Sequence, residues 1–116
     1  MRGLGHAVIE VIYFGADDCF YCQHWEAARK PELMRLIGAR KARLVEVKGE
    51  TLKRPILERH YPADLKWLYR DLGELRSVPR FVLVVDGKVA LRVHGTSNYS
   101  AILEPRLRAE LARQRP

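Results

Sequence analysis

Runs of apolar residues alternate with polar segments along the chain, and their spacing predicts strands and helices in turn. Residues 7–14 (AVIEVIYF) are almost continuously apolar and rich in β-branched side chains, which is typical of a strand covered on both faces. A helix is expected over about residues 19–37, with Pro31 kinking or dividing it and Gly38 ending it. Residues 42–47 (ARLVEV) predict the next strand.

The middle of the chain predicts a loop and then a second helix. Residues 49–62 (GETLKRPILERHYP) are polar and irregular, so we expect a loop with a short helical turn there. Residues 63–73 (ADLKWLYRDLG) carry leucines at helical spacing and predict an amphipathic helix that the final glycine ends. The leucines expected to face the core are Leu65, Leu68 and Leu72.

The last third of the chain predicts a β-hairpin followed by a helix. In residues 80–95, two β-rich runs flank Asp86 and Gly87, the pair that suits a tight type I′ turn. From Ser97 onward the apolar residues have helical spacing, and Pro105 should bend this helix or begin its second part. The positions expected to face the core are Ile102, Leu103, Leu107 and Leu111.

These elements follow one another in the order β-α-β-α-β-β-α, which places the chain in the α/β class. A strand–helix–strand unit comes first, and such units are right-handed with parallel strands. The chain shows no internal repeat, low-complexity tract or linker, and 47% of its residues are hydrophobic. We therefore expect residues 1–116 to form one domain with a core that needs no staple.

The charge balance is strongly basic, with 21 Lys and Arg against 14 Asp and Glu and a net charge of +7. The basic residues are scattered and form no stripe interleaved with aromatics, so a solvated basic surface is favoured over nucleic-acid binding. Such a surface could favour acidic partners or a membrane face. No apolar run is long enough to span a membrane, and the N-terminus lacks the pattern of a signal peptide.

The candidate chemistry lies in ADDCFYCQHW, residues 16–25, which hold the only two cysteines of the chain. Three interpretations compete: a structural staple, part of a metal site and a redox centre. A disulfide that closes so small a ring would constrain the unfolded chain little. A zinc site needs four ligands, and Cys19, Cys22 and His24 would supply three. A c-type haem requires His directly after the second cysteine, where Gln23 stands, and we interpret His24 as a surface residue.

The redox interpretation rests on where the cysteines fall in the predicted elements. Cys19 lies where the strand ends and the helix begins, and the unpaired N–H groups there favour a thiolate. Cys22 lies one helical turn further on and can attack a mixed disulfide formed at Cys19. Asp17 or Asp18 could cap the helix, or their charges could oppose ionisation of Cys19.

The motif SVPRF, residues 77–81, is the second marker. It places Pro79 directly before a strand, where a proline cannot donate to the sheet. The order of elements, CFYC at a strand-to-helix junction, SVPRF before the VDGK hairpin and Gly95 after the last strand together resemble the thioredoxin-like superfamily over nearly the whole chain. The resemblance implies a thioredoxin-like fold, with a central mixed four-stranded sheet flanked by helices.

The resemblance also implies roles for individual residues. Cys19 takes the place of the exposed nucleophile, and Cys22 takes that of the buried resolving thiol. Pro79 matches a cis proline that packs beside the cysteines. The residues implied to contact a substrate peptide are Phe20, Tyr21, Val78, Pro79 and Gly95. Protein thiols or disulfides would be the substrates, a separate redox partner would be needed, and the monomeric protein would carry no cofactor beyond its own disulfide.

Several positions depart from thioredoxin. The tryptophan before the first cysteine is Asp18 here, and the Gly-Pro between the cysteines is Phe20-Tyr21. The buried acid six residues before the first cysteine is Tyr13. An aromatic before the second cysteine is closer to periplasmic and secreted relatives, so we expect an exported protein whose leader is absent from this chain, with a cytoplasmic protein as the alternative. Residues 49–62 hold extra length that could shape the substrate surface.

The sequence therefore predicts a thiol–disulfide oxidoreductase and leaves oxidant, reductant and isomerase as alternatives. A second hypothesis is a thioredoxin-like binding module that captures peptides along Val78 and Pro79, with the cysteine pair idle or serving as a switch. A metal chaperone is the third.

Overall fold

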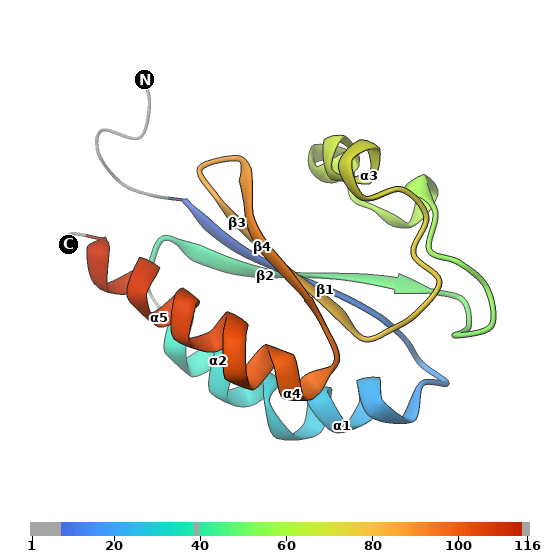
Figure 1. The fold of residues 1–116 in the computed structure, drawn as a ribbon, viewed down its shortest axis with the longest axis horizontal. Coiled ribbons are helices and arrows are strands. Elements are labelled where there is room, and N and C mark those ends of the chain that lie inside the picture. The colour runs from blue at the N-terminus through green and yellow to red at the C-terminus, as the bar shows by residue number, and fades with distance from the viewer. Residues whose placement is uncertain (1–7, 39, 115–116) are drawn as a thin grey trace.

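The structure is a computed structural model that describes residues 8–38 and 40–114, and its centre is one four-stranded sheet. The strands lie in the order β2-β1-β3-β4; β1 pairs with β2 in parallel and with β3 in antiparallel, and β3 pairs with β4 in antiparallel (Figure 1). Their bounds are β1 Ile9–Ala16, β2 Ala42–Gly49, β3 Arg80–Val85 and β4 Lys88–His94. The predicted mixed four-stranded sheet flanked by helices is confirmed.

The first strand, β1, runs through the middle of the sheet. All eight of its residues are buried, as expected for a strand covered on both faces. Alternate side chains of β1 enter two separate apolar layers: Tyr13 belongs to the layer under α1 and α5, and Phe14 belongs to the layer under α3. The strand extends two residues beyond the predicted end, and Ala7, where it was expected to start, lies outside the described residues.

The helical segment after β1 is divided, as predicted. The first part, α1, spans Phe20–Ala28, and the second, α2, spans Lys30–Ile37. Pro31 lies in the first turn of α2, where its missing N–H breaks no helical hydrogen bond. Gly38 ends α2 with a positive φ of 38°, a conformation that glycine adopts readily.

The C-terminal segment packs on the same face of the sheet as α1 and α2 (Figure 1). It consists of α4 Thr96–Asn98, a π-helical turn Tyr99–Leu103 and α5 Glu104–Arg113, which Pro105 begins. The predicted core residues Leu103, Leu107 and Leu111 are buried, but Ile102 is 48% exposed, so that part of the prediction is wrong. Residues 99–103 form a π-helical turn, so they do not follow the 3.6-residue spacing on which the prediction rested; Tyr99 and Leu103 face the core and Ile102 does not.

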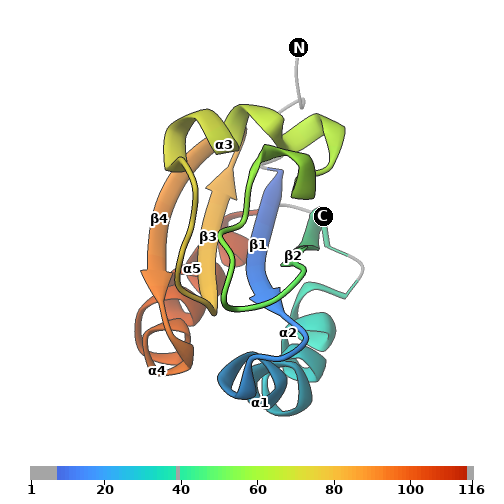
Figure 2. The same cartoon turned by 90° about the vertical axis from the view of Figure 1, so that its right-hand side faces the viewer.

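The opposite face of the sheet carries α3, Lys66–Leu72, which Figure 2 shows across the top of the strands. Two 3₁₀ turns, Glu58–His60 and Ala63–Leu65, precede it. The predicted helix over residues 63–73 is confirmed, with its first turn wound more tightly. The loop before α3 contributes to the core although most of its residues are polar. Its Ile56 and Tyr61 are buried in the layer under α3.

The hairpin between β3 and β4 turns at Asp86 and Gly87, as predicted. Both residues have positive φ values, 52° and 78°, which is the signature of a type I′ turn. None of the helices in residues 8–38 and 40–114 has the length and apolar character that crossing a bilayer requires.

Candidate active site

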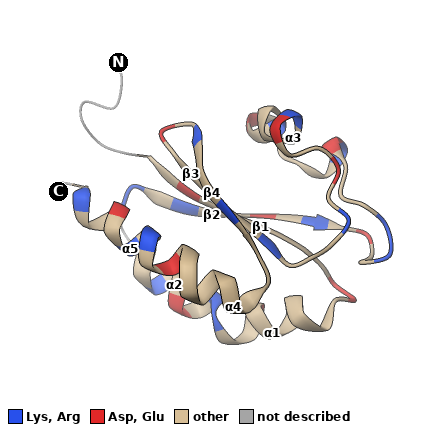
Figure 3. Ribbon diagram, in the orientation of Figure 1, with Lys and Arg blue, Asp and Glu red and all other residues tan. Residues whose placement is uncertain are grey.

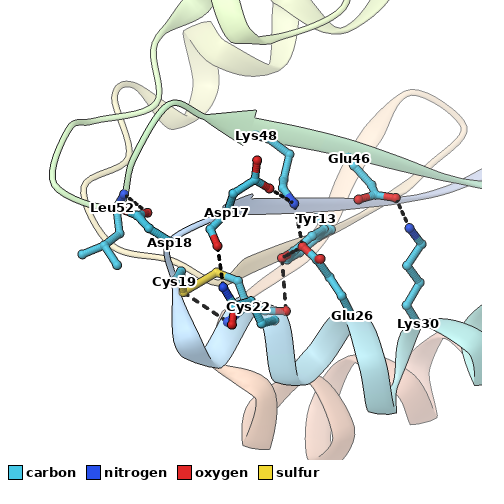
Figure 4. Close-up of polar contacts among 11 residues, drawn as sticks. Tyr13, Asp17, Asp18, Cys19, Cys22, Glu26, Lys30, Glu46, Lys48 and Leu52 are labelled. Carbon is cyan, nitrogen blue, oxygen red and sulfur yellow. Dashed lines mark hydrogen bonds and ion pairs between the residues drawn. A yellow bond between two sulfur atoms is a disulfide. The ribbon is translucent and has the colours of Figure 1, made fainter.

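The two cysteines form a disulfide where β1 ends and α1 begins (Figure 4). Their Cα atoms are 5.1 Å apart, a normal separation for a disulfide. Cys22 is completely buried, whereas Cys19 keeps 4% of its surface exposed. Both cysteines are thus buried, and Cys19 is the one of the two that keeps any exposed surface.

The cap of helix α1 is Cys19 itself. The backbone N–H of Cys22 donates a hydrogen bond to the Sγ of Cys19 over 3.1 Å. The prediction that Asp17 or Asp18 caps this helix is wrong, because both carboxylates turn to partners outside it. A helix N–H thus points at the sulfur where negative charge would develop on reduction, an arrangement that favours a thiolate.

The motif SVPRF lies against this disulfide. The Sγ of Cys19 is 3.9 Å from the carbonyl oxygen of Val78, and the peptide bond between Val78 and Pro79 is cis. The N–H of Gly95 donates to the Pro79 carbonyl oxygen over 2.9 Å, which brings the end of β4 to the same place. Gly95 has a φ of 91°, in the region that favours glycine. The structure therefore brings three of the five expected peptide-contacting positions together, with Val78 against Cys19 and Gly95 against Pro79.

The two residues between the cysteines project into solvent. Phe20 is 73% exposed and Tyr21 is 67% exposed, and their rings contact each other edge to face with centroids 5.5 Å apart. Large aromatic side chains with this exposure are unusual on a solvated surface and suit contact with a partner. His24 is also exposed, as expected. Within the described residues, no three His, Cys, Asp or Glu side chains converge in a way that could hold a metal ion.

A chain of polar contacts behind Cys22 joins β1, α1 and β2, and the sequence analysis missed two of its members (Figure 4). The buried Tyr13 hydroxyl donates to Oε2 of Glu26 over 2.6 Å and lies 3.5 Å from the Cys22 carbonyl oxygen. The Nζ of Lys48 donates to the same Oε2 over 2.7 Å and pairs with Asp17 at 3.0 Å. Glu26 lies four residues after Cys22 on the helix, and this spacing was the signal that could have revealed it.

Comparison with solved structures shows which known proteins share this architecture. A thioredoxin mutant from Halobacterium salinarum matches with a TM-score of 0.56 and 23% identity, covering 90% of this chain and 75% of that one. An uncharacterised thioredoxin-like protein from Porphyromonas gingivalis matches with a TM-score of 0.56 and 17% identity, over 100% of this chain and 82% of that one. The periplasmic thioredoxin SoxS from Paracoccus pantotrophus matches with a TM-score of 0.51 and 18% identity, over 90% and 97%.

The chain has the thioredoxin fold. A scan of protein-family models and a search of curated protein sequences both found no match. The likeness to these structures is thus one of fold, and at these identities it does not extend to individual substrates or partners. The side chains around the disulfide are particular to this chain.

Thioredoxin has a buried acid at the position of Tyr13. In this chain Glu26 supplies a carboxylate beside that position, hydrogen-bonded to the Tyr13 hydroxyl. Burial opposes the ionisation of Glu26, but hydrogen bonds from Lys48 and Tyr13 outweigh it and hold its pKa below the usual 4.5. Burial, followed by the hydrogen bond to Glu26, raises the pKa of Tyr13. At neutral pH the group therefore consists of a neutral phenol, a carboxylate and an ammonium.

Replacing Glu26 with glutamine should destabilise the protein by about 1 kcal/mol near neutral pH, the usual value for a partly buried charged hydrogen bond. The folded-state pKa of Glu26 lies below its unfolded value, so its stabilisation is present above about pH 4.5 and is lost as the pH falls through the lowered pKa. Urea unfolding of both proteins at pH 7 and pH 3 tests this. A difference that stays equal at the two pH values would contradict the assignment.

Asp18 connects the disulfide region to the segment of residues 49–62. Its carboxylate accepts hydrogen bonds from the Leu52 N–H over 2.8 Å and from the Thr51 hydroxyl. The hydrogen bond from Thr51, then that from Leu52, hold the pKa of Asp18 below its usual 3.8. The residue directly before Cys19 is therefore charged at neutral pH and fixes the adjoining loop. The expected role of this segment in shaping the surface beside the cysteines remains a prediction.

Replacing Asp18 with alanine should release this loop. The amide of Leu52 would lose its acceptor, so its hydrogen exchange should become faster by roughly an order of magnitude. Asp18→Asn is the matched variant, because its side-chain oxygen can still accept from Leu52 while the charge is gone. Exchange measured by nuclear magnetic resonance should remain slow in Asp18→Asn, and equally slow exchange in Asp18→Ala would show that the carboxylate does not hold the loop.

Proposed function

We propose that this protein is a thiol–disulfide oxidoreductase that acts on cysteines of other proteins. Cys19 is the attacking thiol in this proposal, and Cys22 is the resolving thiol. The observation that carries it is the disulfide at the start of α1, in which Cys19 accepts a helix N–H and is the one residue of the pair with exposed surface. The redox group is the disulfide itself, with no further cofactor, and the protein acts as a monomer.

In the reducing direction, the Cys19 thiolate attacks one sulfur of a substrate disulfide. That S–S bond breaks, a mixed disulfide to Cys19 forms, and the other substrate sulfur leaves as a thiolate that takes up a proton. Cys22 loses its proton and attacks the Sγ of Cys19, which releases the second substrate thiol and forms the Cys19–Cys22 disulfide. Two electrons pass to the substrate, and a separate dithiol partner must restore the reduced pair. In the oxidising direction the same steps run in reverse.

The surface around Cys19 supports an extended peptide as the substrate. The Val78 carbonyl lies 3.9 Å from the Cys19 sulfur, so a peptide beside it could pair its backbone there while presenting its own sulfur. Phe20 and Tyr21 offer exposed apolar area on the other side of the disulfide. These contacts would position the substrate sulfur in line with Cys19.

Reduction of insulin by dithiothreitol tests the proposal. The wild-type protein should accelerate the precipitation of insulin chains well above the rate with dithiothreitol alone, and the double variant Cys19→Ser/Cys22→Ser should not. If the wild type gives only the background rate yet binds reduced peptides, the result favours the alternative of a binding module that captures peptides along Val78 and Pro79. Titration against glutathione then distinguishes reductant from oxidant through the equilibrium potential.

We further propose that the protein works in an exported compartment. The aromatic residue Tyr21 directly before the second cysteine supports this, as does the similarity in fold to a thioredoxin described as periplasmic. The cytoplasm is the alternative. Fractionation of cells that express the native gene, followed by immunoblotting, distinguishes the two compartments.

A further inference from the structure

A cavity of about 340 Å³ opens on the face of the sheet that carries α3. It lies between β3, β4 and the end of α3, and its volume falls in the range of small-molecule sites. Its apolar wall is formed by Leu72, Leu75 and Val82. Its polar side is formed by Arg80, Arg92 and His94.

The strand register explains why these polar side chains meet. Arg80 pairs with His94 across β3 and β4, and Val82 pairs with Arg92 two positions further along. Paired residues of antiparallel strands project to the same face, and so do residues two apart on one strand. The two arginines and the histidine therefore lie on the same face of the sheet as Val82. Figure 3 shows basic positions on both β3 and β4.

The charge in this cavity is not compensated. None of the described residues that line it is acidic. Arg80 donates to the backbone oxygen and the hydroxyl of Ser77, both over 3.0 Å, which fixes its guanidinium without neutralising it. Within the described part of the chain, the side chain of Arg92 has no hydrogen-bond or ion-pair partner. Some other arginines of the described residues meet carboxylates, as Arg43 meets Glu10 and Asp64, whereas the exposed Arg35 and Arg54 have no carboxylate partner there.

A solvated arginine on the edge strand β4 would also protect that edge from pairing. Edge protection, however, requires neither a second arginine on the neighbouring strand nor an apolar wall beside it. Two arginines that line a partly apolar cavity match a carboxylate joined to an apolar body, because arginine binds carboxylates through paired N–H groups.

We propose that this cavity binds a small-molecule carboxylate that carries an apolar ring system. The carboxylate contacts Arg92 and Arg80, and the rings lie against Leu72, Leu75 and Val82. The site goes beyond thiol–disulfide exchange, since the exchange steps use neither Arg92 nor this apolar wall.

Titration of the oxidised protein with 1-naphthoate, followed through backbone amide signals, tests the proposal. The largest shifts should map to Leu75, Val82 and Arg92. The neutral analogue 1-naphthamide, which has the same shape, should bind at least about tenfold more weakly, a loss of about 1.4 kcal/mol. The measurement needs no redox activity, so its outcome is independent of the proposed function.

Two variants with the same loss of charge complete the test. Arg92→Gln should weaken 1-naphthoate binding at least about tenfold. Arg35→Gln, at an exposed position on α2 on the other face of the sheet, should leave binding unchanged. Equal binding of naphthoate and naphthamide, equal losses in the two variants, or shifts that map outside the cavity would each overturn the proposal.

Discussion

Reduced Cys22→Ser protein, mixed with a disulfide-containing peptide, should accumulate as a stable mixed disulfide on Cys19. Without the Cys22 sulfur nothing in the chain can attack the Cys19–peptide bond, so the intermediate is trapped. Reduced Cys19→Ser protein should react at least about a hundredfold more slowly, because its remaining thiol is completely buried. Intact mass measured after an acid quench gives the amount of adduct in each protein.

The two single-cysteine variants serve as controls for each other. After unfolding in guanidinium, each should show one thiol that reacts at an ordinary rate, which verifies that a slow reaction in the folded protein comes from burial. Faster adduct formation by Cys19→Ser than by Cys22→Ser would reverse the assigned roles. Equal rates would remove the distinction between attacking and resolving thiols.

Trp25→Ala should lower the free energy of unfolding by about 3–5 kcal/mol, the range for removing a large aromatic side chain from a core. Trp25 is completely buried on α1, one turn beyond Cys22. Its ring centroid lies 4.4 Å from that of Tyr13 and 5.0 Å from that of Phe81, so it joins the helix of the disulfide to the sheet. Guanidinium unfolding followed by circular dichroism measures the loss.

Ile102→Ala is the control for this prediction. Its side chain is 48% exposed although its spacing predicts a core position, so we expect a loss of about 0.5 kcal/mol or less. Trp25→Phe should cost less than Trp25→Ala, because a ring remains and the buried indole N–H has no hydrogen-bond partner among the described residues. Similar losses for Trp25→Ala and Ile102→Ala would contradict the burial of Trp25 in the core.

The parts of the fold that could be predicted are those fixed by neighbours in the sequence. Asp86-Gly87 sets the hairpin through the backbone angles of two residues, and Pro31 divides a helix by its own ring and missing N–H. The position of Cys19 at the start of α1 follows from the same local pattern. For the site, the spacing of the two cysteines and the SVPRF motif pointed to residues that the structure places side by side.

The parts that could not be predicted are side-chain contacts with partners that are distant in the sequence. Asp18 stands where a cap is expected, yet it binds Leu52, which is 34 positions away along the chain. Lys48 reaches Glu26 only because β2 lies parallel to β1 beside α1. The sequence alone does not show which partner an exposed charged side chain will bind, because the possible ion pairs differ little in free energy.

The sulfur that caps α1 is also the sulfur proposed to exchange disulfides, so the helix and the redox couple form one thermodynamic cycle. A thiolate accepts the Cys22 N–H more strongly than a disulfide sulfur does, because it carries a full charge. The additional stability that the stronger cap gives to α1 is present only in the reduced protein. This stability therefore shifts the redox equilibrium toward the reduced form. Substitutions that strengthen or fray the first turn of α1 therefore change the oxidising power of the protein, even where they contact neither cysteine.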